Sequence, residues 1–231
     1  MVQTIKEKLI GAEQISESLL LNLLLAFSGG FQDAYTYIGR GHVFANAQTG
    51  NIVLMSTNLL SGEFSVVLHY LFPVLAFAGG IFFADFLRMF HQGRVTSHWR
   101  QTVLLWEIII LFVVAFLPGS LNDIANMLVS FSCAMQVETF RKVNGRAYAS
   151  TMCIGNIRSC MAALGECVLQ GKHEKWAAVS DYLSVITVFA IGAGIGGIVT
   201  MQAGLMTIVA SPLVLLAAYV MMFHRPKGER R

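Results

Sequence analysis

The chain has 231 residues, of which 55% are hydrophobic and 13% charged, and it carries a formal net charge of +3. Water-soluble domains have about 25% charged residues, so this chain has too little polar surface to cover a soluble globule. With a mean hydropathy of +0.64, the composition excludes an ordinary soluble protein and predicts an integral membrane protein. The four cysteines show no CxxC spacing and no neighbouring histidine, so we expect free thiols and no metal site.

Taken in chain order, the sequence predicts six membrane-spanning helices between two polar ends. Residues 1–16 mix both charges and are expected to form an interfacial segment, with no cleavable signal peptide. Residues 224–231 form a basic tail. A span needs about 20 mostly apolar residues. The stretches that approach this length are 19–38, 66–87, 102–117, 121–138, 178–199 and 203–223.

Two further segments, 45–61 and 150–169, are more polar, and each carries a Gly-Asn pair. If both crossed the membrane, Lys and Arg would be divided almost equally between its two sides. If neither crosses, all of the 16 Lys and Arg residues except Arg40 fall on the side of the N-terminus. Cytoplasmic loops are enriched in these residues. We therefore predict six spans with both termini cytoplasmic, and interpret the two polar segments as re-entrant; eight crossings are the alternative.

The two halves of the chain resemble each other. Residues 27–51 (FSGGFQDAYTYIGRGHVFANAQTGN) and 131–156 (FSCAMQVETFRKVNGRAYASTMCIGN) both begin with Phe-Ser and end with Gly-Asn. Gln32 in the first corresponds to Gln136 in the second. An internal repeat of about half the chain length sets the architecture of the whole protein.

Each half contains three predicted spans, and an odd number of spans inverts the second half relative to the first. The predicted fold is therefore an all-α integral membrane protein with two inverted-topology repeats, a plan common among transporters. One transmembrane domain covers residues 17–223, with repeat one at 17–117 and repeat two at 118–223.

A double motif connects the first half to a known family. Gly30-Phe-Gln-Asp33-Ala34, followed by Phe44-Ala-Asn-Ala-Gln-Thr-Gly-Asn51, resembles the YoaK family of small bacterial membrane proteins, a domain of unknown function. The resemblance covers most of the chain, from about residue 20 to 223. It implies a multi-pass inner-membrane protein and no particular activity. In the second half, Gln136 and Gly155 match the family pattern and their neighbours depart from it.

The Gly-Asn segments are the first candidate binding elements. Thr49, Gly50 and Asn51 precede an apolar helical run, and Gly155 and Asn156 stand at the matching place in the second half. A helix that begins inside a membrane offers unpaired N–H groups and the positive end of its dipole, which suits an anionic or polar ligand. Close helix packing through Gly50 is the alternative.

Asp33 is the second candidate, because an ionisable residue within a membrane span is costly and is a functional hypothesis by default. We take Glu138 as its counterpart in the second half, so that two carboxylates could carry a proton or cation in turn. The structural alternatives are ion pairs of Asp33 with Arg40, and of Glu138 with Arg141 or Lys142.

Two more charged residues complete the set. Glu107 lies in an apolar span and must face the helix bundle or be protonated. Arg158, on the second polar segment, could hold an anionic group or lie at the membrane interface. The candidate substrate or ion-binding residues are Gln32, Asp33, Thr49, Gly50, Asn51, Glu107, Gln136, Glu138, Gly155, Asn156 and Arg158.

No enzyme motif accompanies these residues. The pattern G-x-G-x-x-G at 192–197 lies inside an apolar span and indicates close helix packing rather than a dinucleotide site. We expect no catalytic residues, cofactor, metal site or nucleic-acid partner. The expected partners are the lipid bilayer and an unidentified small solute, with a homo-oligomer left open. The leading hypothesis is a transporter or channel of the bacterial inner membrane for a small polar or anionic solute, with proton coupling as an option. The alternative is a non-transporting scaffold or a subunit of a larger membrane complex.

Overall fold

The computed structural model describes residues 15–91 and 99–223, and it is built almost entirely of helices. The α-helices are α2 (Leu19–Gly39), α3 (Gln48–Leu60), α4 (Phe64–Phe90), α5 (Trp99–Ala115), α6 (Asn122–Thr139), α7 (Cys153–Gln170), α8 (Trp176–Ala203) and α9 (Ala210–Met221). Short 3-10 helices occupy Ile15–Glu17, Gly119–Leu121, His173–Lys175 and Leu205–Val209. The predicted all-α class is confirmed, while the predicted basic tail and most of the predicted interfacial segment lie outside the described residues.

One β-hairpin interrupts the helices, and the sequence analysis did not anticipate it. Strands β1 (Lys142–Val143) and β2 (Arg146–Ala147) pair antiparallel. Asn144 and Gly145 form the turn, with φ of 47° and 76°. Asn-Gly favours such tight hairpin turns because both residues tolerate positive φ.

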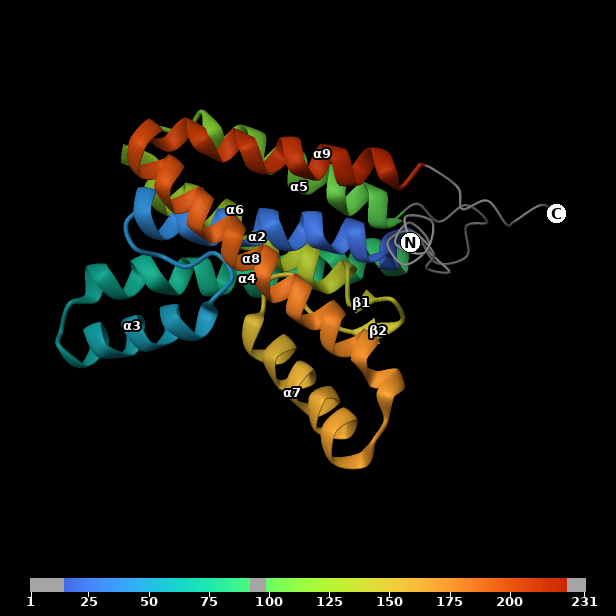
Figure 1. The fold of residues 1–231 in the computed structure, drawn as a ribbon. Coiled ribbons are helices and arrows are strands. Elements are labelled where there is room, and N and C mark those ends of the chain that lie inside the picture. The colour runs from blue at the N-terminus through green and yellow to red at the C-terminus, as the bar shows by residue number, and fades with distance from the viewer. Residues whose placement is uncertain (1–14, 92–98, 224–231) are drawn as a thin grey trace.

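The long helices form a bundle in which neighbours run in both directions. Figure 1 shows α2, α5 and α8 running one way along the bundle and α4, α6 and α9 running the other way. We call the end where α2 begins and α9 finishes the terminal end, and the opposite end the far end. In the described residues, α4 and the stretch His173–Ala203 are each long and apolar enough to cross a membrane, and Leu205–Met221 is apolar but shorter.

The closest helix contacts are made by glycines and occur in two equivalent places. Helix α2 packs along α8, and α6 packs along α4. A Cβ atom on Gly192 would lie 2.2 Å from the carbonyl oxygen of Phe27, and one on Gly80 would lie 2.3 Å from that of Phe131. Small residues allow helix backbones to approach this closely inside a membrane, where packing drives association.

The core lies between α2, α5, α6 and α9, and the outer surface is apolar. The buried cluster includes Leu25, Leu111, Val129 and Leu215. Large apolar side chains also cover the outside; Phe82 is 76% exposed and Leu213 is 62% exposed. A surface of this kind requires an apolar environment such as the bilayer.

The two remaining helices, α3 and α7, are each shorter than the helix on which they pack. Helix α3 has 13 residues and packs on α4, which has 27. At a rise of about 1.5 Å per residue, α3 covers about half the length of α4. Because α3 ends where α4 begins, it must start midway along the bundle, and Figure 1 shows α7 starting midway beside α8 in the same manner. The chain therefore returns into the bundle before each short helix, through residues 40–47 (the first broken segment) and 140–152 (the second broken segment).

Candidate functional site

The first broken segment reaches the middle of α2 and is bound there by Asp33. The backbone N–H of Asn46 donates to Asp33 Oδ1 at 2.8 Å, and Asn46 Nδ2 donates to the carbonyl oxygen of Gly29 at 3.2 Å. Gly29 and Asp33 are one helical turn apart and lie on the same face of α2. The carboxylate thus holds the loop just before α3 begins.

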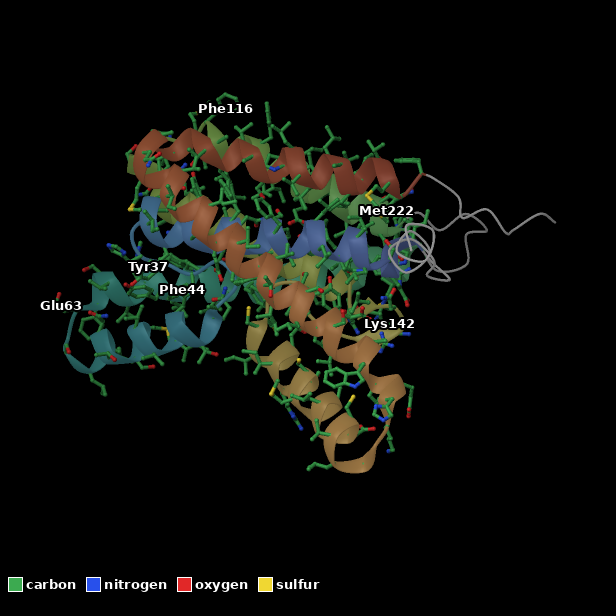
Figure 2. All side chains as sticks on the ribbon, in the orientation of Figure 1. Tyr37, Phe44, Glu63, Phe116, Lys142 and Met222 are labelled. Carbon is green, nitrogen blue, oxygen red and sulfur yellow. The ribbon has the colours of Figure 1, made fainter. Side chains whose placement is uncertain are left out.

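Stacked aromatic rings hold the other side of this segment. The ring of Phe44 stacks on Tyr37 near the end of α2, with ring centroids 4.6 Å apart (Figure 2). A Cβ atom on Gly50 would lie 2.9 Å from the Phe44 ring, so the first turn of α3 leaves no room for a side chain at that position. Gly50 therefore serves close packing here, as the alternative interpretation of the sequence proposed.

The two asparagines of the Gly-Asn pairs close their own loops in the same way. Asn51 Nδ2 donates to the carbonyl oxygen of Phe44 at 2.7 Å, and its Oδ1 accepts from the Phe44 N–H at 3.0 Å. Asn156 makes the same two hydrogen bonds to Ala149, at 2.6 and 3.2 Å. Each amide satisfies a backbone N–H and C=O that would otherwise be unpaired at the break in the helix.

The second broken segment arrives at the same place on α2. Gln136 Nε2 donates to Ser150 Oγ at 2.8 Å and fixes the segment to α6. The neighbouring Thr151 lies against Gly29, since a Cβ atom there would be 2.4 Å from Thr151 Cγ2. Asn46 and Thr151 therefore both contact Gly29. We call the group of Gly29, Asp33, Asn46 and Thr151 the junction.

A fully buried polar network lies beside the junction, around Gln32. Gln32 Nε2 donates to Ser28 Oγ (2.9 Å), Ser211 Oγ (3.0 Å) and Glu107 Oε1 (3.4 Å), while its Oε1 accepts from the thiol of Cys133 at 2.8 Å. One amide thus connects α2, α5, α6 and α9. Glu107 faces the bundle interior, which is one of the two alternatives that the sequence left open.

Several buried oxygen atoms near the junction have no hydrogen-bond partner among residues 15–91 and 99–223: Asn46 Oδ1, Thr151 Oγ1, Gln136 Oε1 and Glu107 Oε2. Asn46 is 3% exposed and Thr151 is 5% exposed. The Asn46 amide directs its Nδ2 to the Gly29 carbonyl, which leaves Oδ1 without a donor in the described part of the chain. Buried polar atoms without partners are uncommon and costly, and each one calls for an explanation such as an ion or a ligand.

Arg40 does not pair with Asp33. Its guanidinium donates to Tyr35 Oη at 2.8 Å, to Asn122 Oδ1 at 3.0 Å and to three carbonyl oxygens in residues 114–118 at the far end. The reason is geometric, because Arg40 is the C-cap of α2 and its side chain leaves the helix past the last turn. In the described part of the chain Asp33 has no ion-pair partner.

Glu138 lies away from the junction, at the terminal end. It forms an ion pair with Arg141, which also approaches Asp85 at 3.7 Å. Aligning Gln32 with Gln136 places Val137, rather than Glu138, opposite Asp33. The two carboxylates are therefore not equivalent, and only the first half contributes an acid to the junction.

The other residues singled out from the sequence lie outside the junction. Thr49, Gly155 and Arg158 are exposed on α3 and α7. The residues that sequence reasoning missed are Asn46, Ser150 and Thr151 at the loop tips and Ser28, Cys133 and Ser211 around Gln32. Asn46 lay inside the quoted motif and could have been found there, whereas nothing in the sequence connects Ser211 with a glutamine 179 residues away.

Comparisons with known proteins identify the family to which the chain belongs. The chain is 25% identical over 179 residues to the UPF0700 transmembrane protein YoaK of Bacillus subtilis (strain 168), covering 74% of this chain and 78% of that protein. No solved structure matches the chain. A family described as "Protein of unknown function (DUF1275)" matches residues 21–222. With its apolar surface and this match over most of its length, the chain is a membrane protein that belongs to the DUF1275 family.

Proposed function

We propose that this protein is a transporter or channel for a small polar or anionic solute, and that the junction is its central site. The observation that carries the proposal is that two broken segments enter the bundle from opposite ends and meet on Gly29. Irregular backbone at membrane depth is tolerated only where protein surrounds it or where it lines a water-filled cavity. Broken segments that meet at mid-membrane are typical of transporter binding sites.

The proposed topology has six crossing helices (α2, α4, α5, α6, α8 and α9), with α3 and α7 re-entrant from opposite faces, as two inverted repeats. Reciprocal hydrogen bonds support this arrangement. Asn22 Nδ2 donates to the Lys142 carbonyl just after α6, and Asn126 Nδ2 donates to the Arg40 carbonyl just after α2, at 3.4 and 2.8 Å. Each helix thus binds the end of the other, as expected for two equivalent helices that run antiparallel.

The chemistry of the loop tips supports a polar or anionic solute. Neither N-cap residue, Ala47 for α3 or Met152 for α7, makes a side-chain capping hydrogen bond. Helices α3 and α7 each begin two residues after a junction residue, Asn46 or Thr151, so the positive ends of their dipoles lie near the junction and favour anionic groups there. Asp33 and the buried Glu107 are the groups that would carry a coupled proton.

We further propose that the protein lies in the bacterial plasma membrane with both termini cytoplasmic and acts without catalysis. The distribution of positive charge supports this orientation. Figure 1 shows the end of α4, which carries Arg88, and the hairpin strands, which carry Lys142 and Arg146, at the terminal end, and the end of α2, which Arg40 caps, at the far end. Positive residues mark the cytoplasmic side.

The test is uptake by the purified protein in proteoliposomes, screened against small polar solutes and anions with and without a pH gradient. Asp33→Asn should reduce uptake or proton coupling at least about tenfold, because the junction would lose its only charge. Asp85→Asn is the matched control, since Asp85 is partly exposed at the terminal end, where it pairs with Arg88 at 2.8 Å. Equal uptake by both variants and the wild type would remove Asp33 from the mechanism.

A second role, as a scaffold or complex subunit, is favoured by one observation. The terminal end has a cavity of about 170 Å³ whose charged lining is basic on balance, with Arg88, Arg100, Arg141 and Lys142 against Glu17 and Glu138. Basic cavities of this kind bind anionic lipid head groups or acidic partners at the cytoplasmic side. A stoichiometric partner in mild-detergent purification, together with no uptake of any solute, would favour this role over transport.

A further inference from the structure

We infer that the junction is a binding site for a small monovalent cation, formed by the Asp33 carboxylate, Asn46 Oδ1 and Thr151 Oγ1. The inference rests on the proposed transport function and deepens it, because it assigns an alkali cation to Asp33 as the coupling ion in place of a proton. Nothing in the proposed function requires this site, so the two can fail separately.

The first argument is geometric. Asn46 is bound to both Asp33 and Gly29, and Thr151 lies against Gly29. The three side chains therefore gather on one face of α2, one from that helix and one from each broken segment. Asn46 and Thr151 are each more than nine-tenths buried, and each directs at least one oxygen atom to no partner among the described residues.

The second argument concerns the kind of atom left unpaired. Asn46 Oδ1 can only accept, and its nearby candidate donor, the thiol of Cys133, gives its single proton to Gln32 Oε1. A Thr hydroxyl that lacks an acceptor can still offer its lone pairs to a cation. Carboxylate, amide carbonyl and hydroxyl oxygens are the ligands that hard cations prefer.

The third argument is charge. The backbone N–H of Asn46 stabilises the Asp33 carboxylate, yet no Lys, Arg or His forms an ion pair with it within the described ranges. Buried charges are normally paired or coordinate a metal ion. One carboxylate balances one monovalent charge, and the described residues hold no cluster of three or more His, Cys, Asp or Glu that would suit a transition metal.

The position of the site gives the cation a mechanical role. Asn46 lies two residues before α3 begins and Thr151 lies two residues before α7 begins. A cation bound to both would hold the two broken segments on α2 together, and its release would free them. A binding site shared between two moving segments is what couples an ion to alternating access.

The experiment is thermal unfolding of the full chain in detergent, titrated with sodium chloride against choline chloride at constant ionic strength, with potassium and lithium as further probes. A ligand that binds only the folded state raises its melting temperature with concentration. Thr151→Val keeps the methyl group that contacts Gly29 and removes Oγ1. We expect the apparent sodium affinity of this variant to fall at least about tenfold, and Asp33→Asn to abolish the sodium effect.

Thr139→Val is the matched control. Thr139 is also buried and its Oγ1 is also without a partner, but it lines the cavity at the terminal end. This variant should keep the sodium affinity of the wild type. If Thr151→Val does not fold, Thr151→Ser, which keeps the oxygen, and binding of radioactive sodium to the wild type decide the question.

Two outcomes would overturn the inference: no alkali cation stabilises the wild type beyond choline, or Thr151→Val binds sodium as tightly as Thr139→Val does. The same measurements distinguish failure of the cation site from failure of the proposed function. Solute uptake by a protein that no alkali cation stabilises would overturn the cation site and leave the transport proposal standing. Sodium binding without uptake of any solute would do the reverse.

Discussion

The two broken segments are alike in construction and different in charge. Asn51 and Asn156 close them with the same pair of hydrogen bonds, and both segments contact Gly29. The first is then anchored by the carboxylate of Asp33, whereas the second is anchored by the neutral amide of Gln136. The asparagines, which both segments share, close the loop at each break, while Asp33, which anchors only the first segment, gives the junction its single charge. The two segments therefore share the way their loops are closed and differ in the charge of the group that anchors them.

The largest effects are expected from removing the two asparagines that close the broken segments. Asn51→Ala and Asn156→Ala should each lower the free energy of unfolding by about 1–3 kcal/mol, because each leaves a backbone N–H and C=O without partners. The two losses should be similar, as measured by thermal unfolding in detergent. Asn58→Ala is the control, since its amide bonds only to Leu54 within the exposed helix α3. A large loss of stability at one asparagine and none at the other would show that the two segments are not stabilised in the same way.

A smaller effect is expected from releasing the second segment alone. Gln136→Met removes the hydrogen bond to Ser150 and should lower the free energy of unfolding by about 1 kcal/mol. Cys153 follows this segment directly and is half-buried, whereas Cys133, Cys160 and Cys167 are buried. Maleimide labelling of Cys153 should therefore become several-fold faster in Gln136→Met.

The same labelling separates the two anchors. Measured in choline chloride, where no alkali cation can join the two segments, Asp33→Asn should leave the labelling rate at Cys153 nearly unchanged, because Asp33 bonds to the first segment. Cys153→Ser identifies the labelled thiol. If Asp33→Asn exposes Cys153 as strongly as Gln136→Met does, the two segments open as one unit and the distinction between their anchors fails.

A steric clash introduced between the second broken segment and α2 should have an effect of about the same size. Gly29→Ala places a Cβ atom 2.4 Å from Thr151 Cγ2, and Thr151→Ser removes that methyl group. We expect Gly29→Ala to be destabilising by about 1 kcal/mol and the double variant to recover part of the loss, because the strain depends on both residues. Additive losses in a double-mutant cycle would show that the second segment does not rest on Gly29.

The sequence was sufficient to predict the helices, because apolar stretches and their flanking polar residues determine where a membrane helix begins and ends. It also indicated the start of α3, since Gln48 opens the helix directly before Thr49 and Gly50. The hairpin at 142–147 was not predicted, because its strands have only two residues each, too few to establish an alternation of apolar and polar residues, although Asn144-Gly145 favours such a turn.

The hydrogen-bond partners of the site residues could not be predicted from the sequence. Asp33 binds Asn46 rather than Arg40, and Gln32 binds Ser211, because these contacts depend on how the chain returns into the bundle. Spacing along a helix can propose a pair seven residues apart, but it cannot show that the second residue caps the helix and points elsewhere. The counterpart of Asp33 was also misplaced by one residue, although aligning Gln32 with Gln136 in the sequence already gives Val137.

The smallest effect is expected at Arg158, which the sequence offered as an anion ligand. The buried face of α7 carries Asn156 and Cys160, and residues two apart on a helix do not share a face. Arg158 therefore lies on the side of α7 away from α8 and is exposed. Arg158→Gln should change the free energy of unfolding by less than about 0.5 kcal/mol and leave solute uptake unaltered. A loss of uptake in a variant of normal stability would move the solute path from the junction to the outer face of α7, where a second copy of the chain would have to complete it.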